Sequence, residues 1–115
     1  MVECIFCKII SGQIPLEREP IYEDQDYLVI PDKYPKAETH ILLMPKTHIH
    51  SVAEADDADR EVLGGLLILA GKIARRETIP DFKLIFNNGK HAEIPHLHLH
   101  LVSGPSISKI PGAQV

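Results

Sequence analysis

Five short segments of this chain carry apolar residues between polar or turn-forming residues, and in one longer segment aliphatic residues recur every three to four positions. The short segments are expected to be β-strands, whose successive side chains point to opposite faces, and in the last of them leucine alternates with histidine. They cover residues 18–22, 27–30, 40–44, 82–86 and 97–102. The polar residues 23–26 and 87–89 supply turn chemistry, which predicts antiparallel hairpins for the first two and the last two strands.

The longer segment, residues 56–76, predicts an amphipathic helix. Its apolar face is formed by residues with helical spacing: Val62, Leu66, Leu69 and Ile73. Aspartates precede this helix and basic residues end it, as the helix dipole favours. Gly64, Gly65 and Gly71 each cost the helix about 1 kcal/mol relative to alanine, so we expect close packing at these glycines to offset the cost. A shorter helix is expected at residues 4–10.

These elements predict a single α+β domain over residues 1–115, with a five-stranded antiparallel sheet, one long helix and a short N-terminal helix. Residues 103–115 carry prolines and glycines and are expected to be an irregular tail. Hydrophobic residues make up 44% of the chain and charged residues 24%, as in globular proteins. The formal net charge of −4 and the lack of a basic stripe argue against binding of nucleic acid polymers.

Neither a secretory signal nor a transit peptide is apparent, because no cationic segment is followed by a long apolar run at the N-terminus. The most apolar stretch, residues 62–74, is interrupted by glycines and a lysine and is too short to span a bilayer. We therefore expect a cytoplasmic protein without a membrane partner. In a reducing compartment, the pair Cys4-x-x-Cys7 indicates a metal or redox site rather than a structural disulfide.

The strongest chemical signal is the segment His96-Leu97-His98-Leu99-His100-Leu101-Val102. On a strand, the three imidazoles share one face and the leucines take the other. Imidazole is the side chain that titrates near neutrality without perturbation, so three in a row indicate a nucleophile, a proton shuttle or a metal site. The alternative is a half-buried strand whose exposed face is merely polar.

The same segment resembles the defining motif of the histidine triad (HIT) family, His-φ-His-φ-His-φ-φ, where φ is apolar. Three further segments are similar, in the expected order, to small single-domain members of that family: residues 4–15, 40–48 and 87–90. The resemblance implies a nucleotide hydrolase or transferase of the phosphoramidase branch that forms a homodimer. Its substrates would be nucleoside 5′-phosphoramidates or related purine nucleotide conjugates, similar to AMP or GMP and cleaved through a nucleotidyl-histidine intermediate.

By the same resemblance, the middle histidine, His98, is the nucleophile that attacks the α-phosphorus. His100 contacts phosphate oxygens, and His40 orients the triad. A neutral imidazole is a good nucleophile near its pKa, and two successive displacements let one residue serve both steps. His40 opens a predicted strand, however, and a structural histidine with satisfied hydrogen bonds is the alternative there.

Three further residues take substrate-binding roles from the resemblance. Asp32 stands at the place of the family's ribose-binding carboxylate, and Asn87 at that of an amide near the scissile phosphate. Glu93 stands where relatives carry serine or glutamate, so its charge does not argue against phosphate binding. For Asp32 and Asn87 a purely local role is the alternative, because aspartate after Pro31 favours a turn and residues 87–89 are themselves a hairpin signal.

The loop before the triad departs from the family pattern. Members usually carry Gly-Gln, or a similar pair, ahead of the position of Glu93, and the interval from Asn87 to His96 is two residues shorter in this chain. Such a loop normally offers backbone N–H groups to the α-phosphate, a contribution worth roughly a few kcal/mol in the transition state. The deletion predicts reduced or redirected activity.

The resemblance also completes a metal site around the cysteine pair. In members that carry this pair, zinc is held in addition by two histidines that correspond here to His48 and His96. A closed set of Cys4, Cys7, His48 and His96 would be structural, and neither a catalytic metal nor an organic cofactor is expected. Two buried free cysteines are the alternative. The remaining histidines are expected at the surface: His50 and His91.

The implied homodimer would pair through the long helix and an adjacent strand, with Gly64 and Gly65 as the places of close approach. Two other functions stay open. The shortened loop is compatible with a nucleotide-binding or regulatory module whose catalysis is weakened. Cleavage of dinucleoside polyphosphates is the third alternative, within the enzyme class.

Overall fold

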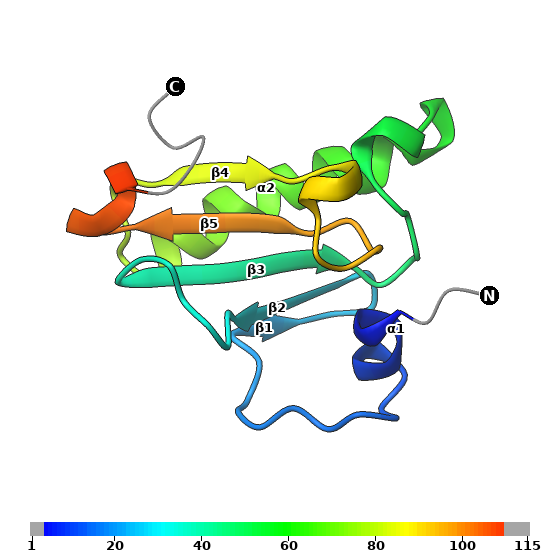
Figure 1. The fold of residues 1–115 in the computed structure, drawn as a ribbon, viewed down its shortest axis with the longest axis horizontal. Coiled ribbons are helices and arrows are strands. Elements are labelled where there is room, and N and C mark those ends of the chain that lie inside the picture. Colours follow the sequence, from blue (N-terminus) through cyan, green and yellow to red (C-terminus); the bar gives the residue numbers. More distant parts are fainter. Residues whose placement is uncertain (1–3, 110–115) are drawn as a thin grey trace.

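Five strands form one antiparallel sheet in the order β1-β2-β3-β5-β4 (Figure 1). A computed structural model describes residues 4–109 of the chain. The strands are β1 (Tyr22–Glu23), β2 (Tyr27–Pro31), β3 (Thr39–Pro45), β4 (Lys83–Phe86) and β5 (Leu99–Ser103). Two α-helices accompany them, α1 (Ile5–Ile10) and α2 (Arg60–Arg76). The predicted α+β class, with its five-stranded sheet and one long helix, is confirmed.

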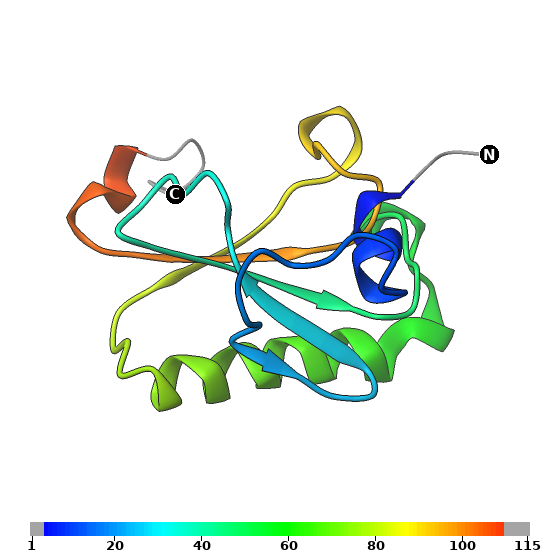
Figure 2. The ribbon, with the colours of Figure 1, turned by 90° about the horizontal axis from the view of Figure 1, so that it is seen from below.

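The alternation of side chains gives the sheet two different faces. Figure 2 shows α2 lying along one of them. Aliphatic side chains from three strands and the segment before β5 pack there against the helix: Val29, Ile41, Leu43, Leu97, Leu99 and Leu101. Full burial of one such side chain is worth about 1.5–3 kcal/mol. The other face packs Phe6 of α1 against Leu28, Ile30, Leu42 and Met44. The leucines and the histidines of the triad therefore belong to opposite faces, as the alternation predicted.

Helix α2 begins after the aspartates, because they form and cap the 3₁₀ turn η2 that precedes it. Asp56 accepts from the Ala58 N–H, and the Asp59 side chain accepts in return from the Asp56 N–H, which makes a capping box around the 3₁₀ turn η2 (Asp57–Asp59). These bonds satisfy backbone N–H groups that have no carbonyl acceptor in a preceding helical turn. None of the helices in the described part of the chain is long and apolar enough to cross a membrane.

Two predicted strands differ from the observed ones. The first was expected at residues 18–22, but β1 covers Tyr22–Glu23, because Pro20 has no N–H to donate to a ladder. The last was expected to begin at Leu97, but pairing with β4 starts at Leu99, opposite Phe86. Leu97 donates instead to the Ile49 carbonyl at 2.6 Å, outside the sheet.

The connection from β4 to β5 is a long loop rather than a tight turn at residues 87–89. It runs from residue 87 to residue 98 and contains the 3₁₀ turn η3 (Gly89–His91). The predicted irregular tail begins with the end of β5 and continues as the 3₁₀ helix η4 (Pro105–Lys109). The rest of that tail, residues 110–115, lies outside the described residues.

Gly65 makes a close approach, but within its own chain. The hydroxyl of Tyr27 donates to the Val62 carbonyl of α2 at 2.7 Å, and a Cβ at position 65 would overlap that hydroxyl. Gly64, in contrast, has open space around the place of a Cβ. Gly65 therefore accommodates Tyr27 of β2 within its own chain, and its expected place in a contact between two chains stays a prediction.

Candidate active site and metal centre

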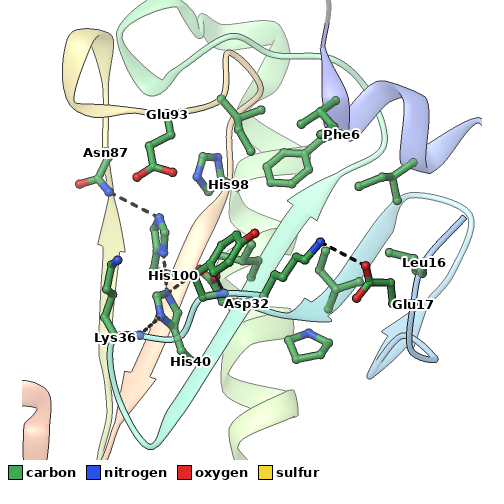
Figure 3. Close-up of a pocket in the computed structure, with 18 of the residues that line it drawn as sticks. Phe6, Leu16, Glu17, Asp32, Lys36, His40, Asn87, Glu93, His98 and His100 are labelled. Atoms are coloured by element: carbon green, nitrogen blue, oxygen red, sulfur yellow. Dashed lines mark hydrogen bonds and ion pairs between the residues drawn. The ribbon is translucent and has the colours of Figure 1, made fainter. Parts of the chain in front are cut away.

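A pocket of about 760 Å³ opens on the sheet face opposite α2. Every residue with an expected catalytic or substrate-binding role lines it: Asp32, His40, Asn87, Glu93, His98 and His100. Figure 3 shows these polar side chains at one end and Phe6 and Leu16 toward the other. More of the apolar lining comes from α1 and the middle of the sheet: Ile5, Ile9, Ile30 and Leu42. The cavity therefore joins a polar compartment to an apolar one.

His98 lies where these two compartments meet. Its Nδ1 is 2.8 Å from the carbonyl oxygen of His96, an atom that only accepts, so Nδ1 carries the proton. In the neutral imidazole, Nε2 then holds the lone pair. The ring packs edge-on against Phe6, with 5.1 Å between ring centroids, and lies 4.9 Å from the ring of His100. Backbone and packing thus give His98 one orientation and one tautomer.

A chain of hydrogen bonds leads from the backbone through His40 to His100. The Lys36 N–H donates to His40 Nδ1 at 3.0 Å, so the proton of neutral His40 is on Nε2. This Nε2–H faces His100 Nδ1 at 2.8 Å and Asp32 Oδ2 at 3.2 Å. Because His100 Nδ1 accepts, the proton of His100 belongs on Nε2, which faces Asn87 (Figure 3). His100 is thus a neutral N–H donor at the pocket.

Burial keeps the imidazoles of His40 and His100 neutral. It lowers the pKa of His100 to about 4, and the neighbouring His98 and His40 act in the same direction. Burial also lowers the pKa of His40, against the opposing effect of Asp32. A phosphate in this pocket would therefore meet N–H donors rather than imidazolium cations at neutral pH.

Asp32 forms the local turn that its position after a proline indicated. Oδ1 accepts from the Tyr34 N–H at 2.8 Å, which closes an Asx turn, while Oδ2 faces His40. Asn87 Nδ2 lies 3.4 Å from His100 Nε2, and a half-turn of the amide presents Oδ1 to the His100 N–H instead. Glu93 is exposed on the loop before β5, and Figure 3 shows its carboxylate beside His98.

Two cysteines and two histidines meet behind the pocket. Their Sγ and Nδ1 atoms all lie within 4.8 Å of one another: Cys4, Cys7, His48 and His96. His48 Nδ1 is 3.2 Å from His96 Nδ1, and His96 Nδ1 is 3.5 Å from both sulfur atoms. Zinc bonds of about 2.3 Å to sulfur and 2.0–2.1 Å to nitrogen put tetrahedral ligands about 3.3 Å (N to N) and about 3.5 Å (S to N) apart. These residues fit that geometry.

The hydrogen bonds and thiols around this cluster favour binding of a cation. His96 Nε2 donates to the Pro45 carbonyl at 2.7 Å, which leaves the lone pair on Nδ1, among the sulfur atoms. The Cys7 N–H points to Cys4 Sγ at 3.3 Å. Burial and the neighbouring Cys4 raise the pKa of the Cys7 thiol to about 11. A bound cation supplies the positive charge that holds such thiols as thiolates.

Asp32, His40 and His100 form a second group with metal-ligand side chains, but its hydrogen bonds argue against a metal. A histidine that binds a metal through Nε2 normally donates its Nδ1–H to an acceptor. Here His40 Nδ1 faces the Lys36 N–H, a donor, so Nε2 must keep its proton. The group is a hydrogen-bonded relay.

The two remaining histidines are at the surface, as expected. His50 is exposed, and its Nδ1 lies 3.6 Å from the Glu54 carboxylate. His91 is exposed on η3 but also lines the pocket, a position that its sequence context did not reveal. Phe6 and Lys36 were also missed. An apolar residue in a short helix and a main-chain N–H carry no chemical pattern, so only spatial proximity reveals them.

Comparison with known proteins agrees with this geometry. The family model described as "Scavenger mRNA decapping enzyme C-term binding" matches residues 3–114. Protein HitA of Neisseria gonorrhoeae is 37% identical over 91% of this chain and 99% of its own length. The "14 kDa zinc-binding protein" of Zea mays is 35% identical over 94% of this chain and 87% of its own length.

Solved structures share the fold. A HIT family hydrolase from Legionella pneumophila superposes with a TM-score of 0.87 and is 38% identical, over 96% of this chain and 100% of that one. A histidine triad protein from Clostridium difficile has a TM-score of 0.81 and 34% identity, over 90% and 94% of the two chains. This chain therefore belongs to the histidine triad (HIT) family, whose similar members include hydrolases.

Proposed function

We propose that this protein is a nucleotide hydrolase or transferase that cleaves nucleoside 5′-phosphoramidates or related purine nucleotide conjugates. His98 Nε2 attacks the α-phosphorus, the bond from phosphorus to the leaving amine breaks, and the amine takes up a proton from solvent. Water then attacks the nucleotidyl-imidazole and loses a proton, the bond between phosphorus and His98 breaks, and a nucleoside monophosphate leaves. One imidazole serves both displacements.

The observation that carries this proposal is the tautomer of His98. A nucleophilic imidazole needs its lone pair on the nitrogen that faces the substrate. The 2.8 Å bond from Nδ1 to the His96 carbonyl holds the proton on the far side of the ring and leaves Nε2 free. The same bond offsets positive charge on the ring as Nε2 bonds to phosphorus.

The rest of the pocket supports a nucleotide as substrate. The His100 Nε2–H and the Asn87 amide lie beside His98, where they can bind oxygens of the α-phosphate. The apolar compartment, which includes Phe6, offers a surface for a purine base. Asp32 stands at the ribose position of the family, and the Glu93 carboxylate lies beside His98 at the polar end of the pocket (Figure 3).

Turnover of two substrates and binding of AMP test this proposal. An adenosine 5′-phosphoramidate, a dinucleoside polyphosphate and AMP are compared, the first two by initial rate and AMP by calorimetric titration. We expect a higher kcat/KM for the phosphoramidate than for the polyphosphate. A higher value for the polyphosphate would favour phosphoanhydride cleavage, and AMP binding without turnover of either substrate would favour a binding module.

The binding module has one specific observation in its favour. Three N–H groups of the shortened loop donate inside that loop, from His91 to Asn88, from Ala92 to Gly89 and from His96 to Ile94. Amides used in this way are not offered to a phosphate. If no other donor replaces them, the transition state loses stabilisation while affinity for a nucleotide persists.

The cysteine and histidine cluster supports a structural zinc ion. Four protein ligands fill a tetrahedral site, and a closed site of this kind contributes to folding rather than to the reaction. We propose that Cys4, Cys7, His48 and His96 hold one Zn²⁺ per chain. The bound ion would link α1, the segment after β3 and the segment before β5.

A homodimer is the third part of the proposal. Leu67 and Ile68 on α2 are 48% and 63% exposed, and Leu84 on the edge strand β4 is 38% exposed. These aliphatic side chains, together with the open space at Gly64, offer apolar surface for pairing through α2 and β4. Sedimentation at micromolar concentration tests it, and the mass of one chain would contradict it.

A further inference from the structure

The carboxylate of Asp32 is engaged before any substrate arrives. Its Oδ1 accepts from the Tyr34 N–H at 2.8 Å, which sets the plane of the carboxylate. Its Oδ2 lies 3.2 Å from His40 Nε2, with side chains that are 18% exposed for Asp32 and 4% for His40. A role at the ribose does not explain this contact.

The contact bears on which nitrogen of His40 carries the proton. Lys36 presents an N–H to Nδ1, and Asp32 presents an oxygen beside Nε2. The tautomer with its proton on Nε2 satisfies both neighbours. The reverse tautomer would set the Nδ1 proton against the Lys36 N–H and the Nε2 lone pair against a carboxylate.

The tautomer of His40 decides that of His100. One hydrogen bond of 2.8 Å joins His40 Nε2 and His100 Nδ1, so only one of these two nitrogens carries a proton. When His40 donates, His100 must carry its own proton on Nε2, toward Asn87 and the pocket. If His40 reversed, the His100 proton would move to Nδ1, and a lone pair would face the phosphate.

We infer that Asp32 is a positioning residue: its carboxylate holds His40 in the Nε2–H tautomer, and through His40 it keeps the proton of His100 on the nitrogen that faces the phosphate. The inference rests on the proposed function, because it assigns this proton to a phosphate oxygen of the substrate. This positioning role of Asp32 is compatible with a contact between its carboxylate and the ribose.

Asp32→Asn tests the inference with the least change in shape. Asparagine keeps an oxygen for the Tyr34 N–H but replaces the acceptor beside His40 Nε2 with an N–H₂ donor. That donor favours the reverse tautomer of His40. Asp57→Asn is the matched control, because it removes the same charge from an exposed carboxylate outside the pocket. Thermal unfolding of both variants controls for loss of the fold.

Two substrates separate positioning from ribose binding. We expect Asp32→Asn to lower kcat by on the order of tenfold, the loss of one transition-state donor. The same factor is expected for an adenosine 5′-phosphoramidate and for its 2′,3′-dideoxy analogue. The Asp57→Asn control should lie within twofold of the wild type on both. A loss confined to the substrate with ribose hydroxyls would overturn the inference, since Asp32 would then act only on the sugar.

Long-range ¹H–¹⁵N spectra of the histidine rings test the relay without turnover. In the wild type we expect one tautomer of His100, with its proton on Nε2, and in Asp32→Asn a shift toward the Nδ1–H form. A His100 tautomer that is unchanged by the substitution would overturn the inference. If the variant shows the expected shift but the wild type cleaves none of the substrates, the proposed function fails and the positioning of His100 by Asp32 stands.

Discussion

His98 and His100 lie two residues apart and line the same pocket, yet their neighbours give their rings opposite chemistry. His98 donates from Nδ1 to the His96 carbonyl, so its Nε2 is a lone pair. His100 accepts at Nδ1 from His40, so its Nε2 is a donor. A nucleophile and a phosphate-binding group therefore come from the same side-chain type, and the difference is set by what each Nδ1 meets.

His98→Ala should abolish turnover while the fold and the affinity for a nucleotide are retained. The substitution removes the attacking nitrogen, and the neighbouring His100 presents an N–H rather than a lone pair to the pocket. We expect kcat to fall by at least about a thousandfold, as measured by phosphoramidate hydrolysis. A nucleotidyl adduct should be found on quenched wild-type enzyme by mass spectrometry and be missing from the variant. The exposed His50→Ala is the control, and activity of His98→Ala within a few-fold of wild type would rule out this nucleophile.

His100 should make stability depend on pH. Its pKa is about 4 in the folded protein and about 6.5 when unfolded. Between these values the unfolded chain binds a proton that the folded chain does not. The contribution of His100 to the free energy of unfolding is therefore complete above a pH of about 6.5 and is lost as the pH drops from about 6.5 toward 4. We expect the melting temperature to fall over this range. The fall should be smaller for His100→Asn, and equal slopes for the two proteins would contradict the assignment.

At the scale of elements, the loop between β4 and β5 determines which triad histidines lie in the sheet and which lie outside it. A tight turn at residues 87–89 would have paired β4 with the residues directly after the turn, and the triad would have lain beyond the end of that ladder. The observed loop instead releases His96 and His98 from the sheet, and pairing begins at Leu99. This release lets His96 join Cys4, Cys7 and His48 in the proposed zinc site while His98 lines the pocket.

Restoring the missing length of this loop should raise activity. Insertion of Gly-Gln between Ala92 and Glu93 would free amides that now donate within the loop and bring them toward the α-phosphate. We expect kcat/KM on a nucleoside phosphoramidate to rise by about tenfold, equivalent to about 1.4 kcal/mol. Stability should hardly change, because surface loops tolerate added residues.

A Gly-Ala insertion at the same place separates the two contributions of the pair. It restores the length and the backbone donors without the glutamine amide, so similar gains for both insertions would assign the effect to the backbone. If Gly-Gln folds normally and kcat/KM is unchanged or lower, the deletion does not limit catalysis, and the native loop supplies its donors in another conformation.

At the scale of the whole molecule, the four proposed zinc ligands come from segments that are distant in the chain. Cys4 and Cys7 belong to the N-terminal segment, His48 follows β3 and His96 precedes β5. Phe6 packs against both His96 and His98, with 5.9 and 5.1 Å between ring centroids. The cluster thus anchors α1, which in turn forms one wall of the pocket.

Removal of zinc should therefore affect stability more than chemistry. Elemental analysis of protein purified without chelators should find one zinc per chain, and Cys4→Ser with Cys7→Ser should lose it. Chelation should lower the melting temperature markedly but the rate only modestly, because the nucleophile is not a ligand. Metal content near zero, or metal that survives the double substitution, would contradict the site.

The sequence by itself determined the fold class and the faces of the sheet. The apolar run of residues 27–30, the alternation in residues 97–102 and the helical period of residues 56–76 reflect local geometry, which the order of residues specifies. The spacing of the three histidines placed them together for the same reason. Resemblance to the HIT family then indicated the partners of His98, and the structure brings each of them to one pocket.

Only the tertiary structure decided how those residues work. The tautomers of His98 and His100 depend on a main-chain carbonyl, on the Lys36 N–H and on the Asp32 carboxylate, and a sequence does not specify which backbone groups meet which rings. The sequence pattern did not indicate that Tyr27 packs against Gly65, a contact that only the fold provides. Contacts between distant segments arise from packing of the whole chain, so no local pattern encodes them one at a time.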